Sequence, residues 1–236
     1  MSARTFALVG ILGLSALGLF GCDSEKAAGD PPAVEPTKTE PAAIFADYRL
    51  LPSEVTPEIQ ADMDKTAPAD GEEVVVFDTS MGKVVVMLYE KVTPKTVANF
   101  KKLVRDAFYD GTRFHRCIPT FMIQGGDPNS KKLDMSDGLW GMGGPGYMIE
   151  DELNPIEHKQ GVLSMAHAGP GTGGSQFFIM DGDAPHLNYV HSAFGRVVSG
   201  QDVVAKIIAT GNAAGTIAPD KAVVLKKATV ETWPIK

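Results

Sequence analysis

One arginine, Arg116, stands within a run of aromatic and apolar residues that reads FHRCIPTFMIQGGD over positions 114–127. An arginine stays charged at physiological pH and presents a rigid fork of N–H donors. It could therefore donate hydrogen bonds to a bound substrate beside an apolar surface. Taken alone, such an arginine is more often a surface or ion-pairing residue, so its interpretation depends on the rest of the pattern.

Other kinds of chemistry find little support in the residues. Three histidines have spacings that fit no standard metal-ligand motif, and no cysteine or carboxylate cluster completes one; these are His167, His186 and His191. The glycines of segment 169–174 formally match a dinucleotide-binding pattern, but the β-like sequence SQFFI at 175–179 follows instead of a helix. No GxSxG nucleophile motif is present. We therefore expect no metal and no other cofactor.

Composition narrows the class further. The chain has 236 residues, is 44% hydrophobic and has a net charge of −7. This length fits one medium domain with appendages, and the acidic balance argues against a nucleic-acid partner. Two cysteines make no disulfide framework. Cys117 lies in an apolar strand pattern and is interpreted as a small buried thiol.

The surrounding sequence predicts the elements that must position these residues. Segments 73–77 and 83–89 are rich in β-forming residues and flank a turn signal, which indicates a hairpin. Thr93 and Pro94 predict the start of a helix that Gly111 closes. A glycine-rich loop is expected at 128–147 and a second helix at 199–211. Further strands are expected at 112–116, 120–125, 161–165, 176–180, 193–198 and 222–233. Many short strands with one early and one late helix favour a small antiparallel barrel, because closure removes exposed sheet edges.

Two stretches point to a family. The first is the run at 114–127, and the second is SMAHAGPGTGGSQFFI at 164–179. Both closely resemble the signature of the cyclophilins, a family of peptidyl-prolyl cis/trans isomerases. Shorter pieces of the signature stand in the expected order around these stretches: PKTVANF at 94–100, Leu187, His191 and Phe194-Gly195. The resemblance covers roughly residues 72–233.

The resemblance implies a mainly β fold, with a closed eight-stranded antiparallel barrel capped by two α-helices. It also implies an enzyme, a peptidyl-prolyl cis/trans isomerase, with a groove outside the barrel that receives an X-Pro segment. Its expected catalytic residues are Arg116, Gln124 and Phe121. Its expected substrate-binding residues are Met122, Ala166, His167, Gln176, Phe178, Leu187 and His191.

This activity suits the residue types. Rotation about a peptide bond costs about 18–20 kcal/mol, and no bond is cut, so neither a nucleophile nor a metal is required. The catalyst must bind the twisted amide better than the planar one. Arg116 would donate to the prolyl nitrogen, Gln124 would orient Arg116 or hold the substrate carbonyl, the backbone at His167 would pair with substrate, and His191 would close the rim. The proline ring would fit an apolar pocket of Phe121, Met122, Phe178 and Leu187.

Three features need explanation. In a regular strand Phe121 and Met122 point to opposite faces, so both can reach one pocket only if the chain bends after Pro119. His167 stands where the family often has asparagine. His186 stands where the family often has tryptophan, a residue associated with strong cyclosporin binding, so tight inhibition is in doubt.

The N-terminus is interpreted as a targeting signal. Arg4 precedes an uncharged, mostly apolar stretch at 6–20, which is shorter than the roughly 20 residues of a spanning helix. The end of this stretch, LFGC at 19–22, resembles the lipobox of bacterial lipoproteins, which implies cleavage before Cys22 and lipidation of its thiol. The alternatives are a cleaved signal with a chance cysteine, or an uncleaved helix.

These readings divide the chain into a signal peptide at 1–21, a lipidated cysteine and Pro/Ala-rich tether at 22–70, and an isomerase domain at 71–236. Within the tether, segment 44–70 has a small apolar cluster interrupted by prolines, for which we expect loose packing on the domain. The protein is expected in the bacterial cell envelope, anchored by Cys22 and facing the extracytoplasmic side. The sequence does not assign it to the inner or the outer membrane.

The expected partners are X-Pro segments of exported client proteins, unfolded or folded, and the membrane through Cys22. We expect a monomer. Two other hypotheses stay open: a binding module for proline-containing segments in which catalysis is incidental, and an envelope lipoprotein that reuses the fold structurally.

Overall fold

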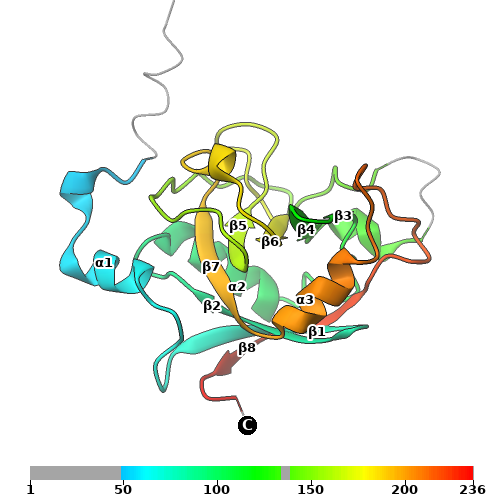
Figure 1. Ribbon diagram of the computed structural model, residues 1–236, viewed down its shortest axis with the longest axis horizontal. Helices are drawn as coiled ribbons and strands as arrows, with labels where there is room; N and C mark the ends of the chain where they lie inside the picture. Colours follow the sequence, from blue (N-terminus) through cyan, green and yellow to red (C-terminus); the bar gives the residue numbers. More distant parts are fainter. Residues whose placement is uncertain (1–48, 134–138, 236) are drawn as a thin grey trace, which may run out of the picture. The chain divides into compact units, whose positions relative to one another are not determined.

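The computed structural model describes residues 49–133 and 139–235, so the predicted signal peptide and Cys22 lie outside the described residues (Figure 1). Eight strands make up most of the regular structure. They are β1 (Glu73–Thr79), β2 (Gly82–Leu88), β3 (Arg116–Ile118), β4 (Met122–Gly125), β5 (Val162–Met165), β6 (Phe177–Met180), β7 (Ala193–Ser199) and β8 (Leu225–Thr232). The helices are α1 (Pro57–Met63), α2 (Pro94–Arg105) and α3 (Gln201–Ile208), with 3₁₀ turns η3 (Pro52–Glu54), η4 (Pro128–Lys131) and η5 (Pro185–Leu187).

The strands form one curled sheet in the order β3-β4-β6-β5-β7-β2-β1-β8, and its ladders are antiparallel. The predicted hairpin is confirmed as β1 and β2, which pair from Val74 with Met87 to Thr79 with Gly82. Gly82 has a φ of 130°, a conformation that side chains rarely adopt, which explains glycine at this turn.

The predicted closed barrel is wrong. In the described residues no ladder joins β3 and β8, the two ends of the strand order. Isolated bridges link the neighbouring segments instead, from Arg113 to Val224 and from Arg116 to Thr216. The reason is that β3 has three residues and its free side faces the irregular chain before β8. The sheet is therefore a curled half-barrel.

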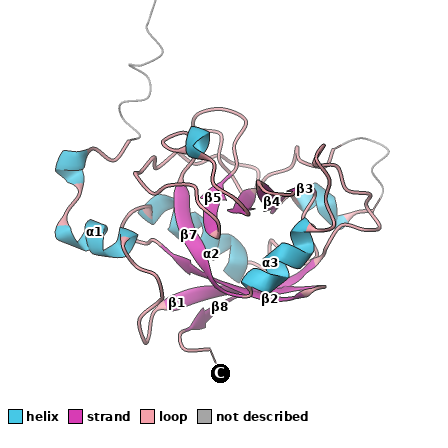
Figure 2. Ribbon diagram, viewed as in Figure 1, coloured by secondary structure: helices cyan, strands magenta, loops and turns pink. Residues whose placement is uncertain are grey.

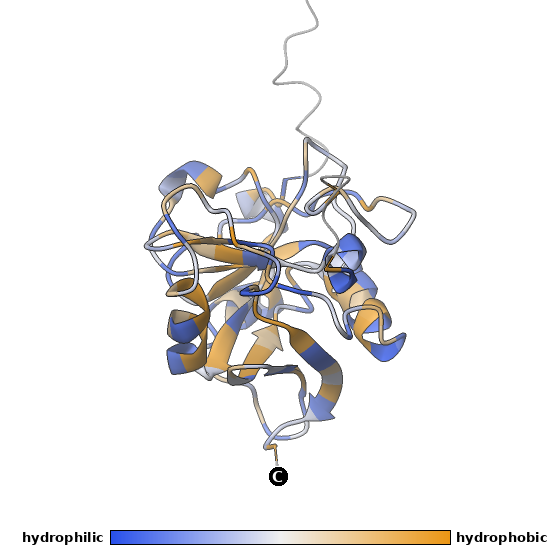
Figure 3. Cartoon of the chain, turned by 90° about the vertical axis from the view of Figure 1, so that its right-hand side faces the viewer, coloured by the Kyte–Doolittle hydropathy of each residue, from blue (hydrophilic) through white to orange (hydrophobic). Residues whose placement is uncertain are grey.

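The main core lies on the concave side of the sheet, under α2 and α3 (Figure 2). Both helices contribute apolar stripes, including Phe100 from α2 and Val204 from α3. Six aromatic rings form its centre through contacts such as the 5.3 Å stack of Phe77 on Phe177; they are Phe77, Phe100, Tyr109, Phe114, Phe177 and Phe194. Figure 3 shows hydrophobic residues along the strands and mixed hydropathy on the helices.

Helix starts differ in detail from the sequence prediction. Thr93 precedes α2 as predicted, but its hydroxyl donates to the carbonyl of Tyr89 and caps nothing. The carboxylate of Glu152 accepts the first-turn N–H groups of Lys95 and Thr96 in its place. The second helix is α3, whose first turn follows Gly200 in a left-handed conformation with φ of 85°.

A third helix, α1, was not predicted. It belongs to a segment that we call the N-terminal strap (residues 49–65), which packs on the convex face of the β1–β2 hairpin. Leu50, Ile59 and Met63 of the strap contact a group of buried residues that we call the strap cluster, made of Val74, Val76, Val85, Met87, Tyr89 and Val92. The loose packing expected for this region is thus replaced by a defined contact from residue 49 onward.

Candidate active site

A chain of hydrogen bonds begins at Arg116 on the convex face of the sheet. Arg116 pairs with Gln124 across β3 and β4, and its Nη1 donates to Gln124 Oε1 at 3.3 Å. Gln124 Nε2 donates to Gln176 Oε1 at 2.9 Å. Gln176 Nε2 in turn donates to the carbonyls of Gly141 and Gly143 at 2.9 and 2.8 Å. The arginine is exposed, yet its guanidinium is bonded to Gln124, which Gln176 holds, and Gln176 is bonded to backbone carbonyls.

An apolar cluster lies beside this chain, on the same face. Strand pairing places Gln124 opposite Phe178 and Met122 opposite Met180. Paired residues of antiparallel strands share a face, so Met122 and Phe178 lie next to the glutamine. We call this group the pocket cluster; it contains Met122, Phe178 and Met180, which are buried, and Phe121, Ala166 and Leu187, which are half-buried.

The predicted bend after Pro119 is present. Thr120 has a left-handed φ of 65°, and the N–H of Phe121 donates to the carbonyl of Ile118 at 3.1 Å, which closes a turn. Strand β4 begins only at Met122. Phe121 is therefore free of strand alternation and joins Met122 in the pocket cluster, while Ile123 points into the main core.

Histidines form the rim of the pocket cluster. The ring of His191 stacks on that of His167 with centres 4.1 Å apart, and it meets Phe178 edge to face at 5.4 Å. His191 Nδ1 lies 3.0 Å from the carbonyl of Met165, and His167 Nε2 lies 2.8 Å from that of Val190. Burial and the neighbouring His167 lower the pKa of His191 from 6.5 to about 4, so this ring is neutral at physiological pH.

The backbone at His167 lies just beyond the end of β5. Strand β5 ends at Met165, and the N–H of Ala166 still donates to the carbonyl of Gln176 at 2.9 Å. One residue later the chain has left the ladder, because the N–H of Ala168 turns to the hydroxyl of Thr172 at 3.0 Å. Backbone at His167 is thus placed where an extended peptide could run along the sheet.

Other residues singled out in the sequence have definite places. The ring of His186 stacks on Phe121 with centres 5.8 Å apart. Cys117 is buried, and burial raises the pKa of its thiol to about 12, in agreement with an inert thiol. Within residues 49–133 and 139–235, no group of three histidine, cysteine or carboxylate side chains is arranged to hold a metal.

A recess of about 570 Å³ adjoins the pocket cluster. It was not predicted from the sequence. One wall is the glycine-rich loop, which the buried carboxylate of Asp127 holds through the N–H groups of Asn129 and Gly141. A side chain at Gly143 would collide with the same carboxylate. Richness in glycine was the available signal, but the loop's position beside the site depends on tertiary contacts. The recess is lined by Gln124, Gly141–Met148, Ala166, His167, Ala168, Thr172 and Gly174–Gln176.

Of the ten predicted site residues, the structure places six in the pocket cluster or on its rim and three in the hydrogen-bond chain. The tenth, Phe121, reaches the cluster through the turn before β4. Ala166 and Gln124 also line the neighbouring recess. The two groups therefore make one continuous surface on the convex face, with a fixed cation at one side of an apolar hollow.

Comparisons with known proteins agree with this geometry. Residues 74–230 match the family described as "Cyclophilin type peptidyl-prolyl cis-trans isomerase/CLD". Peptidyl-prolyl cis-trans isomerase B of Bacillus subtilis is 52% identical over 127 residues, which is 53% of this chain and 82% of the relative. A peptidyl-prolyl cis-trans isomerase of Synechococcus elongatus is 49% identical over 121 residues, covering 51% and 77%.

A solved structure is also similar. It is a cyclophilin-type peptidyl-prolyl cis-trans isomerase of Cryptosporidium parvum, crystallised in the presence of the dipeptide Ala-Pro. The TM-score is 0.59 at 30% identity, and the alignment covers 67% of this chain and 99% of that one.

Proposed function

The chain belongs to the cyclophilin-type peptidyl-prolyl cis-trans isomerase family, and from this premise we propose that Arg116 and the pocket cluster are the machinery with which it turns X-Pro bonds. Rotation must break amide resonance, at a cost of about 18–20 kcal/mol. The site lowers this cost by binding the twisted amide more tightly than the planar one. No bond is cut in this reaction, so every contribution comes from positioning and hydrogen bonding.

The observation that carries the proposal is the hydrogen bond of Arg116 to Gln124 at the edge of the pocket cluster. A guanidinium held by one of its N–H groups keeps the remaining donors free and oriented. In the twisted state the prolyl nitrogen regains its lone pair and accepts a hydrogen bond from Arg116. Gln176 holds Gln124, so the orientation of the arginine is fixed through two glutamines.

The pocket cluster receives the proline ring. Met122 and Phe178 form its floor, Phe121 and Leu187 its sides, and His191 its rim. Burying a ring of this size removes apolar surface from water, which favours binding without changing the barrier. Peptide backbone beside the proline pairs with the chain at Ala166 and His167. The Ala-Pro dipeptide used with the related structure has the same chemistry as this substrate.

The test is exchange spectroscopy on a short X-Pro peptide with the purified chain and its Arg116→Ala variant. We expect loss of at least about a hundredfold in turnover, the size found when one donor to a transition state is removed. Because Arg116 is exposed, the thermal unfolding midpoint should stay close to that of the parent. Arg116→Lys keeps the charge without the planar fork and should recover little activity. Normal turnover in Arg116→Ala would sink the mechanism.

We further propose that the enzyme works on exported proteins while anchored at Cys22. The support is the N-terminal sequence, in which an uncharged stretch ends in LFGC before a Pro/Ala-rich tether. Slow X-Pro isomerisation limits the folding of many chains, so an anchored catalyst on the extracytoplasmic side would serve them as they emerge. In residues 49–133 and 139–235, no helix has the length and apolar character needed to cross a bilayer.

Anchoring is tested by growth with a radiolabelled fatty acid and recovery of the chain from membranes. The parent should carry label and sediment with membranes, whereas Cys22→Ser should carry none. Equal labelling of both chains would rule out Cys22 as the modified residue. We also propose that the enzyme is a monomer.

A further inference from the structure

The N-terminal strap begins beside the pocket rim. The guanidinium carbon of Arg49 lies 3.9 Å from the centre of the Tyr189 ring, the geometry of a cation–π contact. Tyr189 belongs to the turn between Leu187 and His191, two residues assigned above to the pocket. A residue far upstream in sequence thus contacts the loop that shapes the site.

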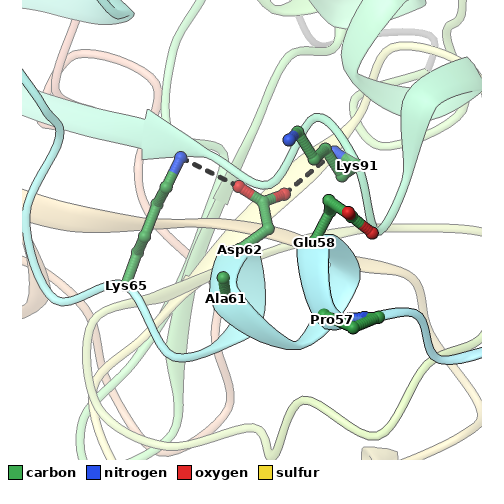
Figure 4. Close-up of a pocket in the computed structure, with 6 residues that line it drawn as sticks. All are labelled: Pro57, Glu58, Ala61, Asp62, Lys65 and Lys91. Carbon is green, nitrogen blue, oxygen red and sulfur yellow. Dashed lines mark hydrogen bonds and ion pairs between the residues drawn. The ribbon is translucent and has the colours of Figure 1, made fainter.

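The strap is held firmly enough to act as a support. Asp62 of α1 is only 3% exposed, and its carboxylate accepts the backbone N–H of Lys91 at 2.9 Å and pairs with Lys65 at 3.1 Å (Figure 4). Lys65 also pairs, at 2.6 Å, with Glu72, the residue that precedes β1. These contacts join the end of the strap to the sheet.

The beginning of the strap is fixed as well. The N–H of Leu50 donates to the carbonyl of Leu153 at 2.7 Å. The segment around Leu153 is bound in turn to the chain that follows the rim turn, because the N–H of Glu152 donates to Ser192 Oγ at 2.8 Å. Arg49 therefore projects from backbone that is tied to the same part of the sheet as the turn it contacts.

The turn itself needs support. Tyr189 has a φ of 57°, a left-handed conformation that is rare for an aromatic residue and persists only when neighbours hold it. The N–H groups of Val190 and His191 both donate to the carbonyl of Leu187, at 3.0 and 3.2 Å. The carbonyl of Val190 accepts from His167. A change at Tyr189 would therefore move Leu187 and His191 together.

We propose that Arg49 is a positioning residue of the isomerase site, which holds the turn at 187–191 in its substrate-binding conformation by stacking on Tyr189. The inference rests on the proposed function, because it takes Leu187 and His191 to line the pocket. The strap precedes the residues that match the family, 74–230. Control of the rim by Arg49 is accordingly a feature of this chain's own N-terminal segment.

The experiment measures KM and kcat for a short X-Pro peptide with the full-length chain and with Arg49→Ala. We expect KM to rise about three- to fivefold, with kcat unchanged within about twofold, because the rim affects binding more than the reacting amide. Arg49→Lys keeps a cation over the ring and should restore KM. In a Tyr189→Ala background, Arg49→Ala should have no further effect, since its partner is gone.

Arg105→Ala is the matched control. Arg105 is an exposed arginine that pairs with Glu73 on another side of the domain, so its loss should leave KM unchanged. A lower unfolding temperature for Arg49→Ala at an unchanged KM would overturn the proposal, because the contact would then be structural only. An equal rise of KM in the Tyr189→Ala background would also overturn it. Failure of the proposed function would appear separately, as full turnover of Arg116→Ala.

Discussion

The convex face of the sheet carries two apolar clusters, of which one is covered by the chain itself and the other is partly exposed. The strap cluster on β1 and β2 is covered by the chain's own Leu50, Ile59 and Met63, and its strand residues are 0–6% exposed. The pocket cluster on β4 and β6 has buried residues at its floor, but Phe121, Ala166 and Leu187 at its sides remain half-buried. In both clusters the strand residues point outward from strands whose other face builds the core.

The difference shows what an outward apolar strand residue requires. Such a residue must be covered, and the chain can supply the cover or leave the place to another molecule. Where the strap supplies it, the face is part of the folded structure. Where a charged fork and backbone groups border an uncovered hollow, the face is suited to a ligand. Four experiments can break or sharpen this comparison.

The largest effect is expected from a charge under the strap. Val76 is 3% exposed, and Val76→Asp would bury a carboxylate among valines and methionines without a partner. We expect a loss of about 4 kcal/mol or more in the free energy of unfolding, measured by urea denaturation. An unchanged urea midpoint would mean that the strap leaves this face and that the cluster is not permanently covered.

The same charge in the pocket cluster should affect catalysis instead of folding. Leu187 is half-buried in a 3₁₀ turn, so Leu187→Asp can keep its new carboxylate in water. We expect kcat/KM for an X-Pro peptide to fall about a hundredfold, equivalent to about 2.7 kcal/mol, with a small change in unfolding free energy. Met81→Asp, an exposed apolar position in the β1–β2 turn, is the control and should retain full activity.

Loosening the strap should cost less than charging its cluster. Asp62→Ala removes the acceptor of the Lys91 N–H and the partner of Lys65. We expect a loss of about 2 kcal/mol in unfolding free energy, from the unsatisfied donor and the broken ion pair. Asp64→Ala, at the residue that follows the same helix, removes an exposed carboxylate and should cost less than about 0.5 kcal/mol. Equal effects of the two variants would contradict a specific role for Asp62.

The smallest effect concerns pH. His191 has a pKa of about 4 in the folded chain against 6.5 ordinarily, so the unfolded chain takes up the proton first as the pH falls. Stability should therefore decrease from about pH 6.5 downward and level off near pH 4, by on the order of 1–2 kcal/mol after solvent screening. Because the ring stays neutral, kcat/KM should hold steady to about pH 5. His191→Asn should flatten the stability curve; an unaltered slope would assign the effect elsewhere.

Most of the candidate site residues could be named from the sequence because they lie in two continuous motifs, whereas Leu187 and His191 lie outside both. The bend that brings Phe121 beside Met122 was inferred from those motifs against simple strand alternation, and the left-handed Thr120 accounts for it. The hairpin and α2 followed from local pattern. The predicted closure of the barrel is wrong, because closure depends on how far the short β3 can pair, which no local pattern records.

Packing of this segment on the domain was expected, but its helix and its firm contact with the sheet were missed, although two signals were present. Thr56-Pro57 starts a helix, since Thr56 Oγ1 accepts the N–H of Ile59 at 3.3 Å and proline takes the first helical position. The prolines were interpreted as interruptions only. The second signal was the unbroken apolar run of β1, VVVF at 74–77, which predicts a strand covered on both faces. Contacts such as that of Arg49 with Tyr189 join distant segments and left no pattern of their own.

The strap also bears on how the enzyme behaves at high concentration. A chain shortened to the family-matched residues 74–230 would lose the strap and Trp233, and with them the cover of Val74, Val76, Val85 and Met87. Those side chains would form an apolar, uncharged strip on the hairpin, the kind of surface through which proteins self-associate. Poor solubility of such a shortened enzyme would then arise from an uncovered surface, and the remedy would be to extend its N-terminus to include residue 49.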